Sequence, residues 1–83
     1  MDIIKKFIKE NNLIDIVIKG NGMEITAEST LPYIIYKASE LHLFSEFFDL
    51  KIKQEEIKSI YLQENEVVTI TLKNKNEIFL KST

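Results

Sequence analysis

His42 is the residue whose chemistry is most versatile, because imidazole is a common general base and metal ligand. Glu46 follows it by four residues, and on a helix this spacing would bring the carboxylate beside the imidazole, where the pair could bind a metal or act as a base. A metal site needs about three or more protein ligands, and on the same helix Glu40 and Asp49 would point in other directions. We therefore expect His42 to be a core-edge histidine that is satisfied by a local hydrogen bond.

Other patterns that carry chemistry are weak or missing. The adjacent carboxylates Glu55 and Glu56 lie in a predicted turn with no cleft implied, so solvated charge explains them better than acid–base catalysis. Gly20 and Gly22 lack the further glycine, the lysine and the following helix of a phosphate-binding loop, and turn geometry explains them. The chain has no cysteine, so it has neither disulfides nor thiolate metal ligands. We expect a protein that is not an enzyme and that binds no metal, cofactor or small molecule.

Length and composition indicate one globular domain over residues 1–83. A chain of 83 residues has room for a single modest core, and its 45% hydrophobic and 29% charged residues lie in the ordinary globular range. No stretch approaches the roughly 18 to 20 apolar residues of a membrane span, and charges recur through the first ten residues where a signal peptide needs an apolar run. We expect a cytoplasmic location and no contact with a membrane.

The charge pattern disfavours nucleic acid as the partner. All eleven cationic side chains are lysines, and the net charge is −2. Arginine provides the bidentate contacts to phosphate and guanine, and a net negative chain offers no attractive field to a polyanion. Fourteen isoleucines and six asparagines indicate in addition a genome rich in A and T.

The order of the predicted elements gives an α+β fold. Apolar residues at helical spacing predict a helix over 2–11, and alternating residues on both sides of 20–22 predict a β-hairpin. Apolar residues at helical spacing also predict a long second helix over 31–48. Four strands should follow, at 50–52, 57–63, 67–73 and 77–81. The expected fold is a small antiparallel sheet, made of the hairpin and a C-terminal β-meander, packed on two helices in the order α-β-β-α-β-β-β(-β).

The predicted second helix would have apolar residues on two sides, and the second side is the main candidate site. That stripe comprises Tyr33, Tyr36, Glu40, Leu43 and Phe47. If the first helix covers it, these residues are ordinary core. If part of it stays uncovered, its aromatics suit an interface with another protein or with a second copy of this chain.

A second candidate surface lies on the outward face of the predicted meander. Aromatic and basic residues would gather there, namely Lys58, Tyr61, Lys73, Phe79 and Lys81. Aromatics among lysines on an open sheet can stack single-stranded bases. Cross-strand packing explains the same residues without any ligand.

These observations favour a small, non-catalytic protein-binding module that regulates or inhibits a larger partner. Small cysteine-free proteins encoded by A/T-rich genomes include phage inhibitors of host defence, antitoxins and toxin-immunity proteins, and the sequence does not separate these roles. The alternatives are a single-stranded nucleic-acid-binding domain and a self-associating structural protein, such as a homodimer.

Overall fold

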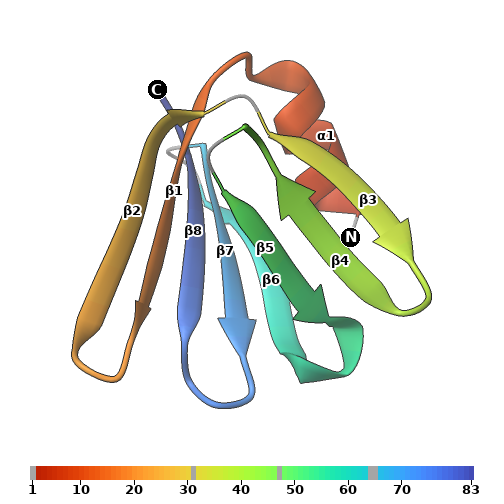
Figure 1. Cartoon of the computed structure of the whole chain (residues 1–83), viewed down its shortest axis with the longest axis vertical. Coiled ribbons are helices and arrows are strands. Elements are labelled where there is room, and N and C mark those ends of the chain that lie inside the picture. The colour runs from red at the N-terminus through yellow and green to blue at the C-terminus, as the bar shows by residue number, and fades with distance from the viewer. Residues whose placement is uncertain (1, 31, 47, 64–65) are drawn as a thin grey trace.

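A computed structural model describes residues 2–30, 32–46, 48–63 and 66–83, and in this part of the chain it contains one α-helix and eight strands (Figure 1). The elements in chain order are α1 (Asp2–Glu10), β1 (Ile14–Gly20), β2 (Met23–Thr30), β3 (Tyr33–Lys37), β4 (Glu40–Phe44), β5 (Asp49–Lys53), the short 3-10 helix η1 (Gln54–Glu56), β6 (Ile57–Gln63), β7 (Val67–Leu72) and β8 (Glu77–Ser82). No helix among the described residues is long and apolar enough to cross a bilayer.

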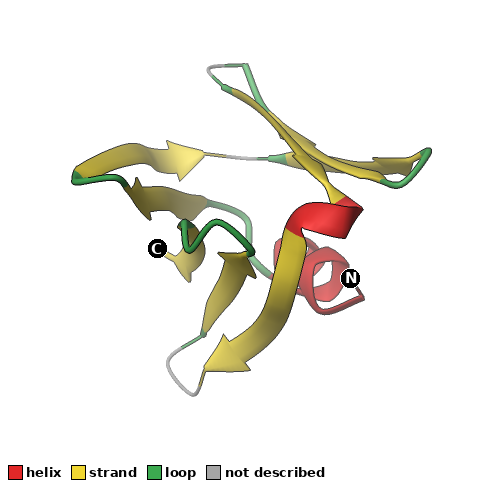
Figure 2. Ribbon diagram, turned by 90° about the horizontal axis from the view of Figure 1, so that it is seen from below, coloured by secondary structure: helices red, strands yellow, loops and turns green. Residues whose placement is uncertain are grey.

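The strands form two antiparallel sheets that face each other (Figure 2). The larger sheet has five strands in the order β2-β1-β8-β7-β6, and the smaller has three in the order β3-β4-β5. Every neighbouring pair is antiparallel. The predicted β-hairpin is therefore confirmed as β1 and β2, and the C-terminal meander as β6, β7 and β8.

The turn of the first hairpin follows from its two central residues. Asn21 and Gly22 have φ angles of 51° and 74°, which a two-residue hairpin turn requires and which these two residue types tolerate best. Gly20, by contrast, does not have a positive φ. A Cβ atom at Gly20 would collide with the side chain of Asn76, so this glycine is explained by close approach and not by the turn conformation.

Helix α1 closes one end of the space between the sheets. It packs against β3, β6 and β7, and it buries Ile4 and Phe7 while its lysines remain exposed. Its end is set by Asn11, whose side-chain amide donates a hydrogen bond of 2.8 Å to the carbonyl of Phe7. The first predicted helix is thus confirmed, with its end one residue earlier.

The core lies between the two sheets and the helix. Alternate residues of each strand point inward, as the two-residue period of a half-buried strand requires. The fully or nearly fully buried members are Ile4, Phe7, Ile14, Ile16, Leu41, Leu43, Ile52, Val68, Ile70, Ile78 and Leu80.

The predicted helix over 31–48 is wrong. Residues 33–37 and 40–44 are the strands β3 and β4, joined by a tight turn at Ala38 and Ser39. Tyr33, Ile34 and Ile35 are aromatic or β-branched and favour a pleated surface, and the two apolar sides of the supposed helix are the two faces of a sheet. The described part of the chain therefore has one α-helix and is mostly β, in place of the α+β fold with two helices that the pattern favoured.

Candidate functional site

The surface with the most features of a binding site is the solvent-facing side of the three-stranded sheet, which we call the outer face. The pairing of the strands arranges its nine side chains in three rows across β3, β4 and β5. The rows are Tyr33-Phe44-Asp49, Ile35-His42-Lys51 and Lys37-Glu40-Lys53.

One end of the outer face is aromatic and apolar. The rings of Tyr33 and Phe44 stack with their centroids 5.6 Å apart, and the His42 ring tilts against Phe44 at 4.7 Å. Tyr33 is 60% exposed and Ile35 is 45% exposed, although neither is needed to cover the core on the opposite side of the sheet. The stacked rings restrict each other's rotamers, so this end presents a preformed apolar surface.

The side chain of His42 is held in this surface by a contact with the neighbouring strand β5. Its Nε2 atom forms a close contact with the Oδ1 atom of Asp49, the residue that begins β5. The expected local hydrogen bond is therefore present, but its partner is not Glu46, because residues 42 and 46 do not share a helix. Asp49, which a helix would have directed away, is brought to His42 by the pairing of β4 with β5.

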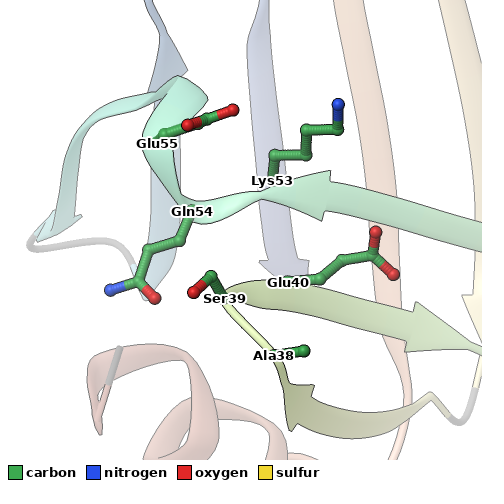
Figure 3. Close-up of a pocket in the computed structure, with 6 residues that line it drawn as sticks. All are labelled: Ala38, Ser39, Glu40, Lys53, Gln54 and Glu55. Carbon is green, nitrogen blue, oxygen red and sulfur yellow. The ribbon is translucent and has the colours of Figure 1, made fainter.

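The other end of the outer face is charged and hollowed. A hollow of about 440 Å³ is lined by Ile35, Lys37, Ala38, Glu40, His42 and Lys51. A second hollow of about 430 Å³ adjoins it and shares Ala38 and Glu40; its wall comes from the β3–β4 turn, the start of β4, the end of β5 and η1 (Figure 3). Charged side chains of both signs surround these hollows, which is typical of the polar rim of an interface.

The turn between β3 and β4 holds an unfavourable backbone conformation. Ala38 and Ser39 have φ angles of 50° and 66°, in the left-handed region that side chains with a Cβ atom disfavour. The turn is held in place by Gln54, whose backbone N–H donates to the Ser39 carbonyl at 2.8 Å. Strain of this kind is often found at functional sites, and here it borders both hollows.

The residues of the predicted stripe are divided between the two faces of the sheet. Tyr33 and Glu40 lie on the outer face. Tyr36 points inward and is half-buried, and Leu43 is completely buried in the core, so neither belongs to an exposed binding stripe. Phe47 lies outside the described residues. The stripe as a continuous surface is wrong, because strands change faces at every residue where a helix would have gathered these positions.

Sequence reasoning missed Ile35 and Phe44 and treated His42 only as a source of chemistry. The signal that identifies all three is the alternation within 33–37 and 40–44, read at a period of two. It is short, since each strand has only five residues. The turn between them also lacks the asparagine or glycine that usually marks a hairpin.

The second candidate surface is only partly assembled. Tyr61 and Phe79 lie on the outward side of the five-stranded sheet, each opposite Thr69 on β7, and Lys81 lies on the same side. The ammonium groups of Lys81 and Lys19 stand 6.0 and 5.5 Å from the centre of the Phe79 ring.

The strand register gives no partner for the other two lysines of that set. Lys58 sits at the register shift of β6, and Lys73 follows β7, where its backbone N–H donates to the Glu56 carbonyl at 2.9 Å. The surface also carries acidic residues in direct register with its lysines, since Asp15 pairs with Lys81 and Glu77 with Lys19. Its lysines are thus accompanied by nearby carboxylates.

Comparison with known proteins gives no relative for this fold. No protein-family model, curated protein or solved structure matches the chain. Among the residues that the structure describes, no three histidine, aspartate or glutamate side chains gather closely enough to hold a metal ion. The candidate site therefore depends on the geometry of the outer face alone.

Proposed function

We propose that the protein is a non-catalytic protein-binding module that regulates or inhibits a larger partner, and that the partner docks on the outer face. The observation that carries this proposal is the exposure of Tyr33 and Ile35 beside the stacked ring of Phe44. Exposed aromatic residues in a preformed cluster are the usual anchors of protein interfaces. Burying Tyr33 and Ile35 would contribute about 3 to 5 kcal/mol to binding, by the transfer of apolar surface from water.

The surroundings of this cluster support a protein partner. Lys37, Lys51 and Asp49 are exposed around the apolar residues, and a charged rim around an apolar centre gives specificity and faster association. The hollows beside Glu40 would accept side chains that project from a partner. A small molecule is less suited to them, because both hollows are open to solvent and most of their lining residues are charged or polar side chains that solvent can reach.

Protein is favoured over single-stranded nucleic acid as the ligand for a reason of charge. On the outward side of strands β1, β2 and β8, the carboxylates of Asp15, Glu24 and Glu77 outnumber the ammonium groups of Lys19 and Lys81. A polyanion would meet repulsion there. A titration with oligothymidylate at low salt distinguishes the ligands: binding that is strong at low salt and falls steeply with added salt would favour nucleic acid.

The test of the proposed function compares matched surface variants. The Tyr33→Ser/Ile35→Thr variant removes the apolar anchors, and Tyr61→Ser removes an aromatic that is 48% exposed on the other sheet as a control. Proteins captured from the native host by the wild type and by the control, but not by the double variant, are the expected partners. Titration of the purified partner should then show a loss of affinity of about 100-fold for the double variant.

Two results would contradict the proposal. One is capture of the same proteins by all three forms at equal yield. The other is a stable dimer in sedimentation at micromolar concentration that Tyr33→Ser/Ile35→Thr dissociates, since the outer face would then serve self-association. A cytoplasmic location and a role as an anti-defence inhibitor, an antitoxin or an immunity protein are compatible with the proposal, and the identity of the captured partner would choose among these roles.

A further inference from the structure

A second surface, separate from the outer face, lies along strand β2. This strand is at the end of the five-stranded sheet, and among the described residues it pairs only with β1, so one side of its backbone faces no other described strand (Figure 1). It has eight residues, and its sequence, MEITAEST, contains no proline or lysine. Proteins commonly use proline, lysine or a covering element to protect an edge strand from pairing.

Strand β2 also carries the two most exposed large apolar side chains of the described residues. Met23 is 67% exposed and Ile25 is 61% exposed. Both lie on the same side of the sheet as the core, since Ile25 pairs with the half-buried Ile18 of β1. Helix α1 packs at the opposite end of this sheet, against β6 and β7, and leaves them uncovered. A strand added to this edge would bury part of these apolar side chains, which stabilises the added strand.

The other side of β2 is acidic. Glu24 and Glu28 are exposed, and Thr26 lies between them. Glu24 is directly opposite Lys19, but that lysine is also opposite Glu77 on β8. Near Glu28 the neighbouring strand presents another acidic residue, Asp15, at the register shift between β1 and β2. The edge therefore combines a free backbone, an apolar side and an acidic side.

We infer that β2 accepts an extended segment of another protein, in which basic residues alternate with apolar ones. The added strand would pair with the β2 backbone, as in β-strand addition to an exposed sheet edge. Its apolar side chains would contact Met23 and Ile25. Its basic side chains, on the opposite side of the same strand, would lie next to Glu24 and Glu28.

Charge distinguishes this occupant from a second copy of the chain. If two β2 strands paired about Thr26, each Glu24 would stand directly opposite a Glu28. Centring the pair on Ile25 places Glu24 opposite Thr26 but still doubles the carboxylates on one side of the sheet. Like charges on neighbouring strands are destabilising, whereas a basic strand would neutralise them.

The experiment uses the full chain and two synthetic peptides, which have blocked ends and alternate valine with either lysine or glutamate. Affinity is measured by fluorescence anisotropy, and the contact site by NMR shifts and hydrogen exchange of the backbone amides. The lysine peptide should bind about tenfold more tightly than the glutamate peptide. The protected amides should be those of β2.

Two variants test the two sides of the strand. Glu24→Lys/Glu28→Lys should reverse the peptide preference, a gain that unfolding cannot produce. Met23→Thr/Ile25→Thr, which keeps side chains suited to a strand, should weaken binding of the lysine peptide by about tenfold. Leu62→Thr, an exposed apolar residue on the other edge strand β6, is the matched control and should leave binding unchanged.

Several outcomes would overturn the inference. They are no binding at millimolar peptide, equal binding of both peptides, protection of β6 or β3 in place of β2, or loss of lysine-peptide binding in the charge-reversed variant without gain of the glutamate peptide. Self-association of the chain through β2 would assign the edge to a second copy. Tyr33→Ser/Ile35→Thr should leave peptide binding unchanged, so the result is independent of the proposed function.

Discussion

Replacing Ala38-Ser39 by Asn-Gly should make the protein more stable. Both residues hold positive φ angles, and the same chain shows what suits this geometry: the β1–β2 turn has the same length, nearly the same φ angles, and the sequence Asn21-Gly22. The left-handed conformation costs an ordinary residue about 1 to 2 kcal/mol, and asparagine and glycine avoid much of it. Glycine offsets about 0.5 to 1 kcal/mol of this gain, because it gives the unfolded chain more conformational entropy.

The net gain in the free energy of unfolding is therefore about 1 to 2 kcal/mol for the Ala38→Asn/Ser39→Gly variant. For a domain of this size, that corresponds to a rise of roughly 4 to 16 °C in Tm. Urea unfolding followed by circular dichroism measures the same gain as a shift in midpoint with an unchanged slope. The reverse exchange, Asn21→Ala/Gly22→Ser, is the matched control and should lower stability by a similar amount.

The direction of this stability change distinguishes a hairpin over 33–44 from a helix over the same residues. In the middle of a helix over 31–48, asparagine and glycine would together lower stability by about 1 kcal/mol relative to alanine and serine. A fall in Tm for the Asn-Gly variant would thus refute the turn and with it the outer face, because the rows of that face depend on the pairing of β3 with β4.

Three further outcomes follow from the packing. Thr69 is 2% exposed, and its hydroxyl has no hydrogen-bond partner among the described residues, so Thr69→Val should raise the free energy of unfolding by about 1 kcal/mol in urea titrations. Gly20→Ala should lower the free energy of unfolding by about 1 to 3 kcal/mol, because the new Cβ atom clashes with the side chain of Asn76. Adding Asn76→Ala should restore more than half of the lost free energy. An equal loss with and without Asn76→Ala would exclude the clash as the cause. Leu43→Ala should lower the free energy of unfolding by about 2 to 5 kcal/mol, whereas Tyr33→Ala should change it by less than about 1 kcal/mol. Similar losses in both variants would mean that the inner and outer faces of the three-stranded sheet are assigned wrongly.

The parts of the fold that the sequence predicted are those with strong local signals. The first helix has a single apolar face and an asparagine that ends it, and the first hairpin has Asn21-Gly22 between two alternating runs. The C-terminal strands have six or seven β-prone residues each, and Val67–Leu72 alternates between the two faces of the sheet. In these segments the local preference and the final structure agree, so no tertiary information was needed.

The segment 31–48 lacked such signals. Its two strands have five residues each, too few to distinguish a period of two from a helical period when both faces contain apolar residues. Its turn consists of Ala38 and Ser39, which do not predict a positive φ. Only the pairing with β5 and the burial of Leu41 and Leu43 against the larger sheet decide the structure, and both depend on distant residues.

The same ambiguity limited the prediction of the site. The predicted stripe is split because a helical period and a strand period assign residues to different faces: Tyr33 and Glu40 lie on the outer face, whereas Tyr36 and Leu43 face the core. The contact between His42 and Asp49 could not be predicted from spacing, since it depends on which residue of β5 pairs with which residue of β4. Composition, by contrast, still bears on the choice of ligand: a chain whose only cations are lysines, and whose carboxylates lie beside them, is poorly suited to a polyanion.

The unfavourable turn and the uncovered edge suggest how binding and stability are related in this protein. A more stable turn needs only two substitutions, and a protected edge needs only a proline in β2, so neither feature is required by the fold. Features that lower stability without a structural need are expected where a protein binds its partner. Ala38-Ser39 borders the hollows of the outer face, and Met23 and Ile25 lie on a free edge. If the two surfaces bind, a variant that stabilises the turn should weaken binding at the outer face while it strengthens the fold, and a proline in β2 should weaken binding at the edge.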